Sequence, residues 1–123
     1  MRLDDALKNI SLIARVENEE ITGITSVISL CEVLIHPLRN QNLNLKQRYL
    51  DILQNSPNFF TKSINSATAQ TAASLRAKYN LRTPDALQIA TALENGCDAF
   101  LCNDKDLKRV TELKILILDE IEL

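Results

Sequence analysis

Three acidic residues stand where an apolar segment meets the start of a helical segment. Glu32 follows the β-branched run 21–28, and Asp104 follows the apolar run 99–102. Asp85 opens a segment that is apolar almost all round. A carboxylate beside a buried segment is costly unless it has a partner or a metal. Together, three carboxylates could hold a Mg²⁺ or Mn²⁺ ion that activates a water and offsets charge on a phosphate, which is the chemistry of phosphodiester hydrolysis.

Each carboxylate also has a purely structural explanation. Ser29-x-x-Glu32 fits a capping box, and Asp85 in the first turn of a helix would oppose the helix dipole. Asn103-Asp104 could form a turn or cap the next helix. For each of the three carboxylates considered alone, the structural explanation is the preferred one. Their joint occurrence at the carboxyl ends of parallel strands, where open α/β sheets bind ligands, favours one shared site.

Strand-like and helix-like segments alternate along the chain, which implies a parallel sheet covered on both faces. The fold class is therefore α/β, with one domain spanning residues 1–123 and no internal repeat or linker. Strands are expected near 21–28, 59–61, 99–102 and 114–118. Helices are expected near 3–14, 29–36, 43–53, 66–79 and 83–95, with a short one at 105–109.

Bulk composition places the chain among ordinary globular proteins. It is 46% hydrophobic and 24% charged, and no apolar run is long enough to cross a membrane. A formal charge of -2 gives no whole-molecule attraction to nucleic acid, so a polyanion would need a local basic patch. The three cysteines form no Cys-x-x-Cys pair, which disfavours a zinc cluster and a disulfide framework. Reduced thiols and a cytoplasmic location are the simplest interpretation.

Basic residues flank two of the three acidic positions and are candidates for binding the phosphates of a nucleic acid. A solvated helix surface explains them equally well. The candidates are Arg82 before Asp85, with Arg76 and Lys78 further upstream, and Lys105, Lys108 and Arg109 after Asp104.

The only histidine, His36, lies one helical turn after Glu32, so a role as general base or metal ligand is conceivable. A position at a helix end beside Pro37, near the last carbonyl groups, is the preferred interpretation.

Three stretches of the chain, taken in order, resemble the PIN domain, and within it the VapC-type toxins of bacterial toxin–antitoxin pairs. They are 25–34, which contains Glu32, then 81–92, which contains Arg-Thr-Pro-Asp-Ala, and 100–107, which contains Asn103-Asp104. The resemblance implies a three-layer α/β/α fold and a Mg²⁺- or Mn²⁺-dependent endoribonuclease, usually dimeric and held inactive by an antitoxin. By position, Glu32, Asp85 and Asp104 match the family's second, third and fourth acidic residues, and Asp106 in the same motif would assist at the metal.

The chain departs from the family at its N-terminal side. The family begins with an apolar strand that ends in an Asp, and nothing before Leu3 matches it. We therefore expect the strands near Ile24 and Leu101 to leave a gap, to pair directly or to borrow a strand. We also expect weak or absent catalysis by this chain, and low stability or self-association. The alternative function is a catalytically impaired PIN remnant that binds an antitoxin or a second copy of itself; a phosphate-accepting receiver domain is a distant third.

Overall fold

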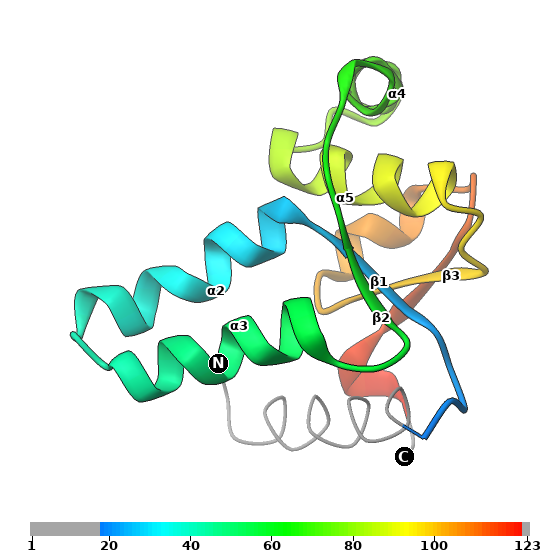
Figure 1. Ribbon diagram of the computed structural model, residues 1–123. Helices are drawn as coiled ribbons and strands as arrows, with labels where there is room; N and C mark the ends of the chain where they lie inside the picture. The colour runs from blue at the N-terminus through cyan, green and yellow to red at the C-terminus, as the bar shows by residue number, and fades with distance from the viewer. Residues whose placement is uncertain (1–17, 122–123) are drawn as a thin grey trace.

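The computed structural model describes residues 18–121 (Figure 1). The helix expected near 3–14 lies outside these residues. The elements in chain order are β1 (Gly23–Ser26), α2 (Val27–Arg39), α3 (Leu43–Asn55), β2 (Phe59–Lys62), α4 (Ser66–Tyr79), α5 (Thr83–Glu94), β3 (Ala99–Cys102), the 3-10 helix η1 (Lys105–Arg109), β4 (Lys114–Ile117) and the 3-10 helix η2 (Leu118–Glu120). The α/β class predicted from the sequence is confirmed. No helix in the part of the chain described is long and apolar enough to cross a membrane.

The strands form two separate parallel pairs. β1 pairs with β2, with Gly23 opposite Phe59, and β3 pairs with β4, with Ala99 opposite Lys114. Within residues 18–121, β1 and β3 are not joined by a ladder of hydrogen bonds. Direct pairing of these two strands, one of the arrangements expected from the sequence, does not occur within residues 18–121.

The first half of the molecule carries a helical hairpin. α2 and α3 pack against each other and extend away from the strands (Figure 1). α2 begins earlier than expected because Ser26, and not a later residue, is its N-cap and accepts a hydrogen bond from the Ile28 N–H at 3.2 Å. The β-branched pair Val27-Ile28, expected in the strand, therefore forms the first helical turn.

α2 also ends later than expected, at Arg39, with Pro37 inside the helix. The Pro37 ring is fully buried, and this burial offsets the backbone hydrogen bond that proline cannot donate. The helical turn is completed by the Asn40 N–H, which donates to the His36 carbonyl at 3.1 Å.

α5 lies at the centre of the core, as its apolar sequence predicts. Ala86, Ile89 and Ala90 are fully buried and pack with residues from α4 and from the segment around η1. The helix ends at Asn95-Gly96, where Gly96 has a φ of 65°, a conformation that glycine adopts without strain. The expected C-terminal glycine is confirmed.

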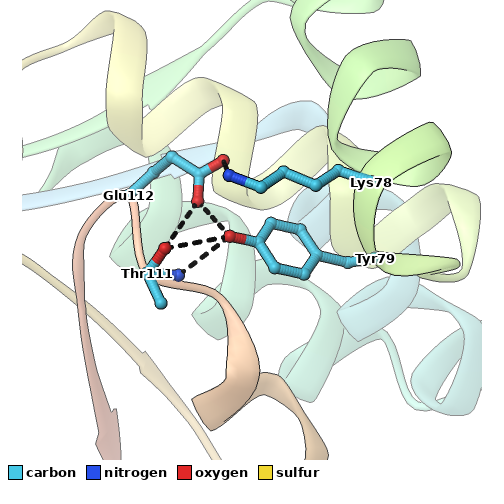
Figure 2. Close-up of polar contacts among 4 residues, drawn as sticks. All are labelled: Lys78, Tyr79, Thr111 and Glu112. Carbon is cyan, nitrogen blue, oxygen red and sulfur yellow. Dashed lines mark hydrogen bonds and ion pairs between the residues drawn. The ribbon is translucent and has the colours of Figure 1, made fainter.

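A cluster of polar contacts holds the segment after η1 against the end of α4 (Figure 2). The Tyr79 hydroxyl donates to the Glu112 carboxylate and accepts from the Thr111 N–H at 3.2 Å, while Lys78 Nζ lies 3.6 Å from Glu112. The Tyr79 hydrogen bond, and then the charge of Lys78, hold the pKa of Glu112 below its ordinary value. Arg109 adds a hydrogen bond to the Tyr79 carbonyl at 2.6 Å. These contacts fix η1 and the residues beside it relative to α4.

Replacing Ile89 by alanine should lower the free energy of unfolding by about 2–5 kcal/mol, because the Ile89 side chain is fully buried and its removal leaves a cavity in the core. The matched change Ile35→Ala, at a residue 42% exposed on α2, should cost no more than about 0.5 kcal/mol. Urea titration monitored by circular dichroism measures both, and equal losses in the two variants would contradict this account of the core.

Replacing Tyr79 by phenylalanine should raise the pKa of Glu112 towards its ordinary value, since the largest cause of the depression is removed. A depressed folded-state pKa means that the contact stabilises the fold above the unfolded-state pKa and is lost as pH falls through the folded-state value. The acid-side loss of stability should therefore become smaller in Tyr79→Phe. Carboxyl NMR titration of Glu112 checks this, with Tyr49→Phe on α3 as the control; an unchanged pKa in Tyr79→Phe would overturn it.

Candidate functional site

Asp85 occupies the first turn of α5, just after the Thr83-Pro84 start of the helix. Its carboxylate is 22% exposed and accepts a hydrogen bond from Arg82 Nε at 3.0 Å. Proline in the first turn fixes the direction in which the helix begins, and the buried remainder of α5 holds that turn in place. The position still permits the favourable interaction with the helix dipole noted from the sequence.

The charges of all three predicted acidic residues act on Arg82. The pKa of its guanidinium lies above the ordinary value, first because of the hydrogen bond and charge of Asp85 and then because of the charges of Asp104 and Glu32. These residues come from α2, from α5 and from the turn after β3. Carboxylates from three separate elements thus lie within electrostatic reach of one guanidinium.

Asp104 is the N-cap of η1. Its Oδ1 accepts a hydrogen bond from the Asp106 N–H at 2.9 Å, so the capping role considered from the sequence is confirmed. This bond uses one oxygen of an exposed carboxylate, and capping therefore leaves Oδ2 able to bind a cation. Asp106 is also exposed, in the first turn of η1, and its carbonyl accepts from Arg109 Nε at 3.1 Å.

Glu32 is exposed in the second turn of α2. The capping box proposed for Ser29 and Glu32 is wrong, because Ser26 caps the helix and Ser29 lies inside it. Glu32 therefore has no role at the helix start, and the structural explanation that competed with a site role is removed for this residue.

Cys102 lies beside two of the acidic residues. Burial, and then the charges of Asp104 and Asp85, raise the pKa of the Cys102 thiol, which keeps it neutral at physiological pH. Its Sγ lies 3.7 Å from the Asp104 carbonyl oxygen. Cys31, on α2, is exposed.

The donors suit a hard divalent cation in kind, since carboxylate oxygens are the ligands that Mg²⁺ and Mn²⁺ prefer. Their positions, however, do not form a complete metal site. Within residues 18–121, no group of three or more His, Cys, Asp or Glu side chains lies close enough to hold a metal ion. Binding would require Arg82 to withdraw from Asp85 and the carboxylates to draw together, and the sharing of one cation stays a prediction.

The predicted RNA-binding residues differ in their surroundings. Arg82 is 78% exposed beside the acidic residues, and Lys105 is exposed on η1. Lys108 pairs with Glu120 at 2.8 Å, and Arg109 binds backbone carbonyls. The first two remain the better candidates for an RNA phosphate.

His36 lies in the last turn of α2 and contacts the side chain of Asn40, the C-cap of that helix. The helix-end position preferred from the sequence is confirmed.

A polar bridge between α2 and α5 is absent from the sequence predictions. Gln88, one turn after Asp85, bonds to Ser26 and Ser29 at the start of α2. The available signal is a glutamine in a helix that is otherwise mainly apolar, which by itself does not reveal its partners.

Comparison with known proteins shows to which family the chain belongs. A family model described as PIN domain matches residues 4–113. The structure is similar to a toxin–antitoxin complex from Klebsiella pneumoniae, with 25% identity, a TM-score of 0.63, and coverage of 78% of this chain and 73% of that chain. It is also similar to VapBC2 from Rickettsia felis bound to a DNA fragment from its promoter, with 18% identity, a TM-score of 0.67, and coverage of 93% and 85%. No curated protein sequence gives a significant match. Because the family model spans most of the chain, the protein belongs to the PIN domain family.

Proposed function

We propose that this protein is a metal-dependent endoribonuclease of the VapC-like toxin–antitoxin type. Glu32, Asp85 and Asp104 would hold a Mg²⁺ or Mn²⁺ ion, with Asp106 assisting. The observation that carries the proposal is the match of residues 4–113 to the PIN domain, together with the exposed pair of Asp85 and Arg82 at 3.0 Å on the first turn of α5. Membership of the PIN domain family supports the same chemistry.

In this proposal the carboxylates bind the cation and orient it, and the cation supplies an activated water and compensation of charge on the phosphate. Arg82 balances the carboxylate charges before the cation binds. Its exposed guanidinium then becomes available to a phosphate of the RNA, together with Lys105. The pair with Asp85 is solvent-exposed on the arginine side, so it is readily exchanged.

The proposed partners are an RNA substrate, a cognate antitoxin and a second copy of the chain, in the cytoplasm. Similarity to toxin–antitoxin complexes supports the antitoxin. The hairpin of α2 and α3 also exposes large apolar side chains, which suits a protein partner. They are Ile35, Leu38 and Leu43, at 42%, 52% and 69% exposed.

The same exposed hairpin favours a second candidate function, in which the chain binds an antitoxin or itself without cleaving RNA. The lack of a hydrogen-bonded ladder between β1 and β3 in residues 18–121 also favours it, because no backbone pairing of these strands fixes the spacing of the acidic residues. A cleavage assay separates the two functions.

Incubation of the chain with RNA and Mn²⁺ should give only weak cleavage, as expected from the sequence, and EDTA should abolish it. Asp85→Asn and Asp104→Asn should each lower the rate by more than the roughly 10- to 100-fold that changes around metal ligands typically cost, because each removes a charged ligand. Asp51→Asn, at an exposed residue on α3 bonded to neighbouring side chains, is the matched control and should leave the rate unchanged. Absence of cleavage by a folded wild-type chain would overturn the enzyme and favour the binding module.

Replacing Arg82 by glutamine should strengthen Mn²⁺ binding by about two- to fivefold at low salt, because a competing cation is removed from an exposed pair. RNA affinity should fall, and the salt dependence of binding should decrease by about one phosphate contact. Isothermal titration with Mn²⁺ and filter binding of RNA measure the two effects, with Arg48→Gln on α3 as the control. Weaker Mn²⁺ binding in Arg82→Gln would contradict the counter-ion role.

A further inference from the structure

The side chain of Gln88 connects the helices that carry two of the three acidic residues. The Ser26 hydroxyl donates to Gln88 Oε1 at 2.7 Å, and Gln88 Nε2 donates to the Ser29 hydroxyl oxygen at 2.6 Å. Thr25 completes the arrangement by donating its hydroxyl to the same Ser29 oxygen at 2.7 Å. One carboxamide thus acts as acceptor and donor at once, across the start of α2.

Burial makes this bridge selective for a carboxamide. Ser26 is 0% exposed, and Gln88 is half-buried beside the core residue Ile89. A buried polar group left without a partner is costly, and no buried side-chain polar atom within residues 18–121 lacks one. A leucine at position 88 would leave both serines without this partner, and a carboxylate would lose the donor to Ser29.

The bridge lies one helical turn from both carboxylates. Gln88 follows Asp85 by three residues on α5, and Ser29 precedes Glu32 by three residues on α2. Residues three apart are neighbours on a helix surface, so Asp85 lies next to Gln88 on α5 and Glu32 lies next to Ser29 on α2. The two helices contact each other. Since β1 and β3 are unpaired, no backbone ladder fixes this spacing in the described part of the chain.

We propose that Gln88 is a positioning residue, whose carboxamide sets α2 against α5 and thereby limits the separation of Glu32 and Asp85, the two carboxylates that these helices would contribute to a divalent cation. The inference rests on the proposed metal-binding function. It assigns no direct contact with the cation or with RNA to Gln88. Asp104, on the turn after β3, is held by other contacts and is independent of the bridge.

Mn²⁺ affinity of the full chain tests the proposal in two backgrounds. In the wild-type background, Gln88→Leu should weaken Mn²⁺ binding by about 10- to 100-fold, the usual effect of losing a residue that orients a ligand. In the Glu32→Gln background the same change should have little further effect, because the carboxylate that it positions is already neutral. Gln70→Leu, on the exposed face of α4, makes the same chemical change away from the bridge and should leave the affinity unchanged. Equal losses from Gln88→Leu in both backgrounds would overturn the proposal.

Amide hydrogen exchange of the metal-free chain gives a second, independent measurement. The Ile28 N–H donates to Ser26 Oγ, so its exchange should accelerate in Gln88→Leu when that hydroxyl loses its partner. If Gln88→Leu does not fold, Ser29→Ala replaces it in this test: the variant removes the hydrogen bond from Gln88 Nε2 and should weaken Mn²⁺ binding, although the Ser26 hydroxyl still donates to Gln88. A wild-type chain that binds no Mn²⁺ would refute the proposed function. The hydrogen exchange of the Ile28 N–H would then be the remaining test of the bridge. Unchanged Ile28 exchange in Gln88→Leu would overturn the bridge itself.

Discussion

Burial of α5 is the constraint on which the arrangement of the site depends. Ala86, Ile89 and Ala90 are fully buried, so the helix cannot slide or rotate without opening the core. Its first turn nevertheless reaches the surface, where it carries Asp85, and its next turn carries Gln88 towards α2. A single helix therefore joins the packing of the core to the placement of a carboxylate. Changes far inside the protein should consequently be felt at the site through small movements of this first turn.

The electrostatics of the site follow from how little of it is buried. Glu32 and Asp104 are exposed and only Asp85 is partly covered, so water screens their mutual repulsion. Arg82 is more exposed still, and it can leave without breaking any contact in the core. An arrangement of this kind holds acidic residues near one another while remaining open to exchange of one cation for another. Deep burial of the same residues would make that exchange slow and costly.

Much of the fold follows from patterns within the sequence, and the errors have local causes. The strands at 59–62 and 99–102 and the helices α3, α4 and α5 agree with the predictions because short periodic runs and clear Pro or Gly boundaries specify them. The start of α2 was harder to place, since Ser26 and Ser29 are both good caps and Val27-Ile28 favours a strand by composition. Gln88 could not be found in this way, because its partners lie 62 and 59 residues away in the sequence. Pairing over such distances depends on tertiary packing, and a single sequence carries no local sign of it.

The separation of the two strand pairs has a consequence for how this protein can vary. A backbone ladder between β1 and β3 would fix their distance whatever side chains they carried, because its hydrogen bonds are made by every residue type except proline. In the described part of the chain that distance is instead set by α5, which contacts both strands. The distance between β1 and β3 therefore depends on the volumes of the side chains on α5, and a change of one methylene group there should alter it. In most parallel sheets, backbone hydrogen bonds fix the distance between neighbouring strands. In this protein, substitutions on α5 can change that distance gradually.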